Sequence, residues 1–165
     1  MRIDSLTDIG VKRKENQDNY WSALLTVDGE EAGIICLCDG MGGMNNGGLA
    51  SKIVVESVRD YIKTSIDFDG LREVIQHANT TIYDIGVDEH SPLGTTCTVI
   101  LCYKGEYQIL HVGDTRCYLL RDASFEPLTT DHSALKKYEI TKKENPSLYN
   151  KYKSKLTCLL YTSDA

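Results

Sequence analysis

The hydrophobic periodicity changes twice along the chain, and the order of these changes limits the folds available to it. Residues 19–27 and 33–38 are strand-like apolar runs, residues 49–66 and 71–85 carry apolar side chains at helical spacing, and residues 95–121 return to β-branched and aromatic runs. Two consecutive helices between two groups of strands do not follow the alternation of βαβ units. The pattern therefore predicts the α+β class, with helices layered on a strand meander.

Weaker patterns predict further elements at the two ends of this region. Residues 2–10 alternate loosely and predict an edge strand, and the polar segment 134–155 predicts a helix–turn–helix. Within the second group of strands, we expect strands over 95–103, 107–112 and 116–121.

Length and composition favour one globular domain. The 165 residues are 41% hydrophobic and 25% charged, which is enough to bury a core. No apolar run approaches the length of a membrane span, and the sequence does not open with a signal peptide. We therefore expect a cytoplasmic, monomeric protein without a membrane partner. The net charge of −6 disfavours nucleic acid as a partner, because phosphate backbones attract basic surfaces.

The charge is unevenly distributed. Residues 131–157 contain seven lysines against three acidic residues, so the remainder of the chain is more acidic than the average. An acidic body suits divalent cations, and a basic segment beside it could attract a phosphorylated chain. A solvated helical face is the alternative interpretation of these lysines.

The six cysteines favour buried reduced thiols over disulfides, because the sequence has no secretory signal and most cysteines lie in apolar, strand-like runs. They are Cys36, Cys38, Cys97, Cys102, Cys117 and Cys158. Cys36 and Cys38 are two residues apart, which places both on one face of a strand. Zinc ligation by this pair is the alternative interpretation.

A carboxylate at the end of a buried strand marks the first candidate site. The apolar run Gly33–Cys38 is followed by Asp39-Gly40-Met41-Gly42-Gly43. Asp39 supplies charge, and glycines let a cation approach backbone carbonyls closely. Asp-Gly is also a common tight-turn dipeptide, so the segment gains meaning only beside others. Four such segments are Arg13-Lys14-Glu15-Asn16-Gln17-Asp18, Gly94-Thr95-Thr96, His111-Val112-Gly113-Asp114-Thr115-Arg116 and Leu128-Thr129-Thr130-Asp131-His132-Ser133.

These five segments, in this order, resemble the motifs of the metal-dependent protein phosphatases (PPM, the type 2C Ser/Thr phosphatases), in particular the bacterial members. The resemblance extends from about Asp4 to Thr157. It implies a two-sheet β-sandwich flanked by helix pairs, with metals at one end of the sandwich. It also implies hydrolysis of phosphoserine and phosphothreonine in proteins, with phosphorylated proteins as substrates and a Ser/Thr kinase as a partner.

The resemblance assigns roles to five residues. Asp39 would bridge two Mg²⁺ or Mn²⁺ ions, and the Gly40 carbonyl would complete one coordination shell. Asp18 would orient a metal-bound water or bind the metal through that water. Arg13 would clamp the substrate phosphate, because a guanidinium fork meets two phosphate oxygens at once. Asp114 would help to hold a third metal ion.

Each role has a structural alternative. Asp18 could cap a turn, Arg13 could be a surface arginine, and Asp114 could end a strand in a turn. Two cations about 4 Å apart would acidify a shared water. The source of the leaving-group proton is open, since Met41 stands where some members carry a histidine, and His132 could either donate the proton or pack in a turn.

The chain departs from the family pattern at its end. That pattern continues with a strand ending in Ser-Asp-Gly and a late Asp-Asn pair, which supply metal-binding aspartates. We therefore predict that residues 1–157 form a partial phosphatase domain whose C-terminal strands are missing. Residues 158–165 can be encoded by a transposon-type sequencing adapter, which suggests a non-native read-through tail. An ordinary apolar C-terminal strand is the alternative.

Three functions are open at this stage. The first is a metal-dependent Ser/Thr phosphatase. The second is a catalytically inactive fragment or a pseudophosphatase domain that binds phosphoproteins, since loss of two ligands weakens metal binding. On this ground, we expect little activity from the 165-residue chain itself. The third is a glycine-rich nucleotide loop at 39–48, which lacks the Gly-Lys-Ser/Thr of a P-loop.

Overall fold

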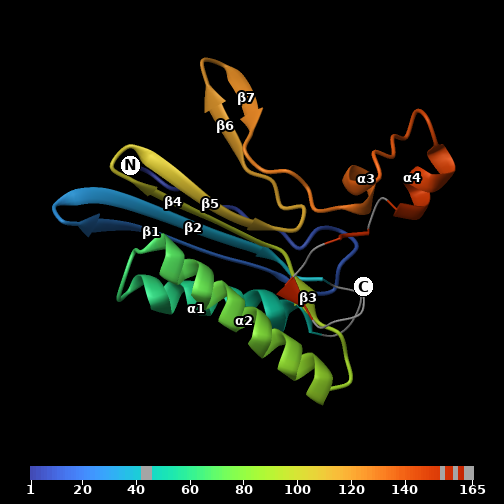
Figure 1. Cartoon of the computed structure of the whole chain (residues 1–165), viewed down its shortest axis with the longest axis horizontal. Helices are drawn as coiled ribbons and strands as arrows, with labels where there is room; N and C mark the ends of the chain where they lie inside the picture. Colours follow the sequence, from blue (N-terminus) through green and yellow to red (C-terminus); the bar gives the residue numbers. More distant parts are fainter. Residues whose placement is uncertain (42–45, 153–154, 158–159, 162–165) are drawn as a thin grey trace.

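A four-stranded antiparallel sheet forms the centre of the molecule (Figure 1). The computed structural model describes residues 1–41, 46–152, 155–157 and 160–161. The sheet has the order β1-β2-β4-β5, with bounds Asp18–Val27, Glu30–Asp39, Cys97–Tyr103 and Glu106–Val112. The sheet consists of two hairpins. A tight turn at Asp28-Gly29 connects β1 to β2, and one at Lys104-Gly105 connects β4 to β5. Both residues of each turn have positive φ, as type I′ turns require.

Two helices cover one face of this sheet (Figure 1). They are α1 (Gly47–Ile62) and α2 (Phe68–Asp88), and Asp67 caps the second by accepting the Gly70 N–H at 2.6 Å. Their apolar stripes meet the inward side chains of β2 and β4. The fully buried aliphatic residues of this core include Ile34, Val54, Val58, Leu71, Ile82 and Val99.

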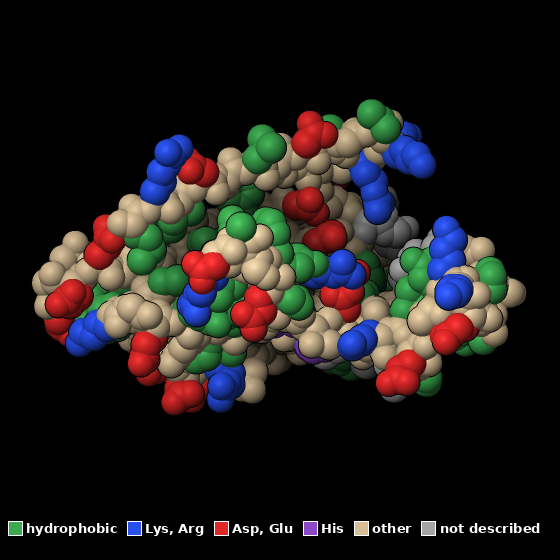
Figure 2. All heavy atoms as spheres, turned by 90° about the horizontal axis from the view of Figure 1, so that it is seen from above, with side chains coloured by type: hydrophobic (Ala, Val, Ile, Leu, Met, Phe, Trp, Pro, Cys, Tyr) green, Lys and Arg blue, Asp and Glu red, His purple; other side chains and the backbone are tan. Residues whose placement is uncertain are grey.

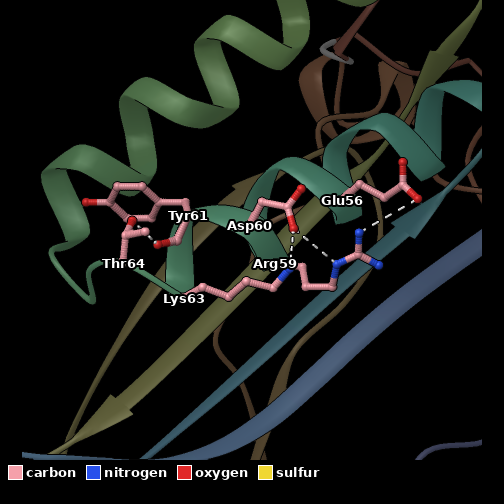
Figure 3. Close-up of polar contacts among 6 residues, drawn as sticks. All are labelled: Glu56, Arg59, Asp60, Tyr61, Lys63 and Thr64. Atoms are coloured by element: carbon pink, nitrogen blue, oxygen red, sulfur yellow. Dashed lines mark hydrogen bonds and ion pairs between the residues drawn. The ribbon is translucent and has the colours of Figure 1, made fainter.

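Charged side chains lie at the solvent side of the end of α1 (Figure 3). Asp60 accepts from Lys63 at 2.7 Å and from Arg59 at 3.4 Å, and Arg59 also lies 3.9 Å from Glu56. The hydrogen bond from Lys63 lowers the pKa of Asp60. These pairs are exposed, so they contribute little to stability.

The opposite face of the sheet is largely apolar and open to solvent. Tyr20, Leu24, Ile35, Leu37 and Tyr107 are all exposed. The register pairs Tyr20 with Leu37, so these side chains share one face of the β1–β2 ladder. Figure 2 shows hydrophobic side chains on this side of the molecule, with charged side chains beside them.

A separate hairpin stands on the side of the sheet away from the helices (Figure 1). It consists of β6 (Tyr118–Arg121) and β7 (Ser124–Pro127), paired antiparallel. Phe125 is 71% exposed and makes an edge-to-face contact with Tyr118 at 6.4 Å between ring centroids. The hairpin therefore adds little to the buried core.

Short elements complete the described chain. The two-residue strands β3 (Gly94–Thr95) and β8 (Leu160–Tyr161) pair antiparallel. The helices α3 (Ala134–Lys137) and α4 (Pro146–Tyr152) form the predicted helix–turn–helix. Among the described helices, none has the length and apolarity needed to span a membrane.

Three predictions of secondary structure need correction. Residues 2–10 form no strand: all of them except the half-buried Ile3 lie exposed, and among the described residues they pair with no strand. The strand predicted over 95–103 is interrupted at Thr96, whose side chain bonds to the backbone of Asp39. The strand predicted over 116–121 begins at Tyr118, and β7 was not predicted.

The tail hypothesis remains a prediction. Residues 158–159 and 162–165 lie outside the described residues, and Leu160 is buried and pairs with Thr95. A short strand is what the alternative interpretation of this tail expects.

Candidate metal and phosphate site

The β1–β2 ladder brings two predicted carboxylates together. Asp18 is the first residue of β1, Asp39 is the last residue of β2, and the register places them directly opposite each other. Side chains at directly opposite positions point to the same face of a sheet. Both therefore lie at one end of the open apolar face.

Three acidic side chains act on each other at this end of the sheet. The pKa of Asp39 is raised to about 6, first by burial, then by the charge of Asp18 and a hydrogen bond with it, and then by the charge of Asp114. The positive charge of Arg13 opposes this shift. The site thus concentrates negative charge that one nearby guanidinium does not balance, which is the electrostatic condition for binding a cation.

Four of the five predicted site residues line one pocket of about 210 Å³. Its walls are formed by Asp8, Ile9, Arg13, Glu15, Asn16, Gln17, Asp18, Asp39 and Gly40. Asp18 and Asp39 remain accessible to solvent, so a ligand can reach both. Figure 2 shows acidic and basic side chains next to each other in a recess of this face.

Asp8 is a pocket residue that the sequence analysis missed. The segment around it was predicted to be an edge strand, whose side chains would alternate between two faces. Instead the chain turns at Gly10, whose N–H donates to the Asp8 carboxylate at 2.7 Å. The Asp-x-Gly spacing before the Arg13 motif was the available indication of a turn.

Close backbone packing requires glycine at position 40. The Gly40 N–H donates to the Gln17 carbonyl at 3.2 Å, and a Cβ at this position would collide with the carbonyl oxygens of Gln17 and Gly47. Ser51 of α1 donates to the same Gln17 carbonyl at 2.6 Å. The start of β1, the end of β2 and the first turn of α1 are thereby tied together beneath the pocket.

Two threonines hold the backbone of Asp39. The Asp39 N–H donates to Thr96 Oγ1 at 2.9 Å, the Thr96 N–H donates to the Asp39 carbonyl at 3.0 Å, and Thr95 Oγ1 donates to that carbonyl at 3.1 Å. The Gly94-Thr95-Thr96 segment therefore supports the site through the backbone.

Thr96 also links Asp39 to the Asp114 loop. Its hydroxyl lies 2.6 Å from that of Thr115, and its methyl group packs against Gly113, which has φ +110° and no room for a Cβ. Asp114 follows this glycine but does not line the pocket, and its charge raises the pKa of Asp39. Asp114 thus lies near the carboxylate pair without joining it.

His132 and His111 form a packed pair in the neighbouring loops. The Gly113 N–H donates to His132 Nδ1 at 3.3 Å, Thr98 Oγ1 lies 2.9 Å from His111 Nδ1, and the two rings lie 5.1 Å apart. Burial, and then the charge of His132, lower the pKa of His111. His132 packs in these loops and does not line the pocket around Asp39, and its role as a proton donor stays a prediction.

An ion pair joins the fourth and fifth motifs. Arg116 donates to both carboxylate oxygens of Asp131, at 2.9 and 2.6 Å, and this bidentate contact lowers the pKa of Asp131. It anchors the segment before α3 to the loop that carries Asp114.

The donors present fit a hard divalent cation in part. Asp18, Asp39 and the Gly40 carbonyl are the oxygen donors that Mg²⁺ and Mn²⁺ prefer. Within the part of the chain that the structure describes, however, no three His, Cys, Asp or Glu side chains are grouped closely enough to hold a metal ion. The described residues therefore supply a pair of carboxylates rather than a complete ligand set.

Comparison with known proteins identifies the family. Residues 11–147 match the family described as Protein phosphatase 2C. A "Putative protein phosphatase 2C-type" of Streptococcus pyogenes is 36% identical over 162 residues, covering 89% of this chain and 63% of that protein. Protein phosphatase PhpP of Streptococcus pneumoniae is 36% identical over 140 residues, covering 81% of this chain and 56% of that protein.

Solved structures agree with this match. A bacterial serine phosphatase superposes with a TM-score of 0.80 at 27% identity, covering 96% of this chain and 67% of that one. The serine/threonine phosphatase Stp1 from Staphylococcus aureus superposes with a TM-score of 0.77 at 27% identity, covering 93% of this chain and 63% of that one. The chain belongs to the protein phosphatase 2C family, and it spans about three fifths of the length of the curated relatives quoted above. The predicted family and the predicted α+β phosphatase fold are thereby confirmed.

Proposed function

We propose that the phosphatase domain represented by this chain hydrolyses phosphoserine and phosphothreonine in proteins with the help of Mg²⁺ or Mn²⁺. The observation that carries the proposal is the meeting of Arg13, Asp18 and Asp39 in one pocket. Relatives support the substrate class, since those from Listeria monocytogenes and Mycobacterium tuberculosis are named serine/threonine phosphatases.

The proposal assigns one residue of this chain to the substrate phosphate and the others to the divalent cations. Arg13 binds the phosphoryl oxygens through its guanidinium fork. Asp18, Asp39 and the Gly40 carbonyl would hold two cations, and Asp114 would contribute to holding a third. Bound divalent cations supply phosphoryl charge neutralisation and the acidification of water. Burial, and then repulsion by Asp18 and Asp114, raise the pKa of Asp39, and a cation held beside this carboxylate would favour its charged form.

The cellular setting follows from the proposed activity. The substrates are phosphorylated proteins, and a Ser/Thr kinase that phosphorylates them is the partner. A cytoplasmic monomer remains our expectation.

The second hypothesis, an inactive fragment or a phosphoprotein-binding domain, stays a prediction for the 165-residue chain taken alone. No trio of ligand side chains is present within the described ranges, so this chain would hold cations weakly and turn over slowly, or would only bind phosphoproteins.

Manganese-dependent hydrolysis of p-nitrophenyl phosphate and of a phosphothreonine peptide tests both hypotheses. The longer protein, carrying the remaining length of its relatives, should be active, and Asp39→Asn should abolish its turnover. Asp28→Asn, in the turn at the far end of β1, is the control and should leave the rate unchanged. Turnover that survives metal chelation would refute the proposal, and normal metal-dependent turnover by the 165-residue chain would refute the second hypothesis.

A further inference from the structure

Three free thiols are buried together beneath the candidate site. Cys36 and Cys38 of β2 and Cys97 of β4 are 0%, 0% and 1% exposed, and all belong to the core between the sheet and the helices. The Sγ atoms of Cys36 and Cys38 lie 3.9 Å apart. The proposed phosphatase activity uses none of them.

The strand register places Cys38 opposite Cys97. The last residue pair of the β2–β4 ladder is Leu37 opposite Thr98. Three positions further on, an isolated bridge pairs Gly40 with Thr95 in the same register. Cys38 and Cys97 occupy the next position after Leu37 and Thr98 in this alignment.

The backbone hydrogen bonds show that Cys38 and Cys97 form a non-hydrogen-bonded pair of the antiparallel ladder. The Thr96 N–H donates to the Asp39 carbonyl at 3.0 Å, so the pair after the two cysteines is hydrogen-bonded. Such pairs alternate with non-hydrogen-bonded pairs, in which opposite side chains lie closer together. Cys38 and Cys97 are therefore at the position where a cross-strand disulfide needs the smallest movement, since its Cβ atoms must approach to roughly 4 Å.

The contact between Cys36 and Cys38 is unsuited to a disulfide. Residues two apart on a strand are separated by roughly 6.6 Å along the strand, and their Cα–Cβ bonds point in the same direction. That separation exceeds the roughly 4 Å between Cβ atoms that a disulfide permits. Cys97 is thus the geometric partner of Cys38.

A cavity gives small molecules a route to Cys97. This cysteine borders a space of about 460 Å³ between α2 and the end of the sheet, beside Arg72, Gln76, Asn79 and Leu160. Neither Cys36 nor Cys38 lines this cavity, so of these three buried thiols Cys97 is the one that a small oxidant in the cavity meets first.

We propose that Cys38 and Cys97 form a site of reversible disulfide formation driven by hydrogen peroxide. The Cys97 sulfur attacks one peroxide oxygen, the O–O bond breaks, and the thiol proton leaves with the departing hydroxide as water. The Cys38 sulfur then attacks the oxidised sulfur of Cys97, the S–O bond breaks, and the Cys38 proton leaves in a second water. Two thiols and one peroxide yield one disulfide and two waters.

The disulfide reaches the candidate site through the backbone. Cys38 precedes Asp39, and Cys97 follows Thr96, which bonds to both backbone groups of Asp39. Drawing the two strands together shifts this anchor and weakens Mn²⁺ binding several-fold. This consequence rests on the proposed function, whereas the disulfide itself does not.

Peptide mapping of the whole chain tests the proposal. The protein is treated with hydrogen peroxide, its remaining thiols are alkylated, and cross-linked peptides are sequenced by mass spectrometry without reduction. The expected product joins Cys38 to Cys97, has a mass lower by two hydrogen atoms, and reverts with dithiothreitol. Cys36→Ala, on the same strand face, should retain the cross-link, and Cys38→Ala should lose it.

The outcomes separate the two proposals. A Cys36–Cys38 link, or oxidation confined to Cys102 and Cys117, would overturn the disulfide proposal. Because fragmentation of the unsubstituted chain localises the link, this result stands even where a variant fails to fold. Mn²⁺ titration of the reduced protein tests the cation site, and titration before and after oxidation tests the coupling between the two. Equal affinities would overturn the coupling.

Discussion

Asp39 illustrates how one residue can be unfavourable for the fold and useful for the site. Its carboxylate lies opposite Asp18, feels the charge of Asp114, and is partly removed from water, so its charged form is disfavoured. Its backbone is nevertheless held from both sides by Thr96. Such a residue becomes stabilising only when a cation offsets the repulsion.

The raised pKa makes a prediction about stability in the absence of metal. The ordinary value is 3.8 and the folded value is about 6, so the folded state binds the proton more tightly. Stability therefore falls as pH rises through the window from about 4 to 6. Asp39→Asn should remove this loss and raise the free energy of unfolding at pH 7.5 by about 1 kcal/mol, after discounting for solvent screening.

Urea unfolding at pH 4 and at pH 7.5, with a chelator present, measures this effect. The gain should shrink to a small part of this value at pH 4, where Asp39 is protonated in the folded state and partly protonated in the unfolded state. Asp84→Asn, on the outer surface of α2, serves as the control. A gain of equal size at both pH values would contradict the electrostatic explanation.

Thr96 is the subject of a second prediction about a single residue. Its hydroxyl accepts the Asp39 N–H and lies 2.6 Å from the hydroxyl of Thr115, and the residue is only 2% exposed. Thr96→Val should cost about 1–3 kcal/mol, because it leaves the partly buried N–H of Asp39 without its partner. Thr80→Val is the matched control, since the Thr80 hydroxyl bonds only within its own helix. Chemical denaturation measures both, and equal losses would show that the Thr96 hydroxyl has no special role.

The helix pair matters at the scale of elements because it fixes the inner face of the sheet. Residues on α1 and α2 meet β2 and β4 through a continuous apolar layer. This layer leaves the other face free, and the carboxylates at the strand ends point toward that free face. The position of the site is therefore a consequence of which face the helices cover.

Leu71 tests this packing. It is fully buried at the start of α2, so Leu71→Ala should destabilise the chain by about 2–5 kcal/mol through lost burial and a residual cavity. Leu49→Ala, at a 38% exposed position of α1, should cost far less. Thermal and urea unfolding compare the two variants, and similar losses would argue against a core beneath the helix pair.

In the molecule as a whole, the helices cover one face of the four-stranded sheet and the other face is exposed to solvent. The open face carries Tyr20, Leu24, Ile35, Leu37 and Tyr107 as exposed apolar residues. Monomeric soluble proteins rarely expose large contiguous apolar patches, so this face should bind hydrophobic probes.

Substitution on the open face tests this expectation. The double variant Leu24→Gln and Leu37→Gln should reduce the fluorescence of a bound hydrophobic dye markedly. The free energy of unfolding should change by at most about 1 kcal/mol, because both side chains are already partly solvated. Val87→Gln, an exposed site on α2, should leave dye binding unchanged. Equal dye binding by all three proteins would place the probe elsewhere.

The local elements and the family could be predicted from the amino-acid sequence. Apolar and β-branched runs located both hairpins, and helical spacing located both long helices, to within a few residues, because these patterns arise from neighbours along the chain. The five motifs predicted Arg13, Asp18, Asp39 and Gly40 as one site, and the structure brings these four into one pocket. Their chemical roles stay predictions.

Only the tertiary structure decided what depends on pairing between distant segments. The register set Asp18 against Asp39 and Cys38 against Cys97, and a turn brought Asp8 into the pocket in place of the predicted edge strand. A strand requires a partner for its backbone groups, and residues 2–10 have none among the described residues. Local propensity specifies the conformation of a segment, whereas burial and cross-strand contacts between remote residues decide which side chains meet.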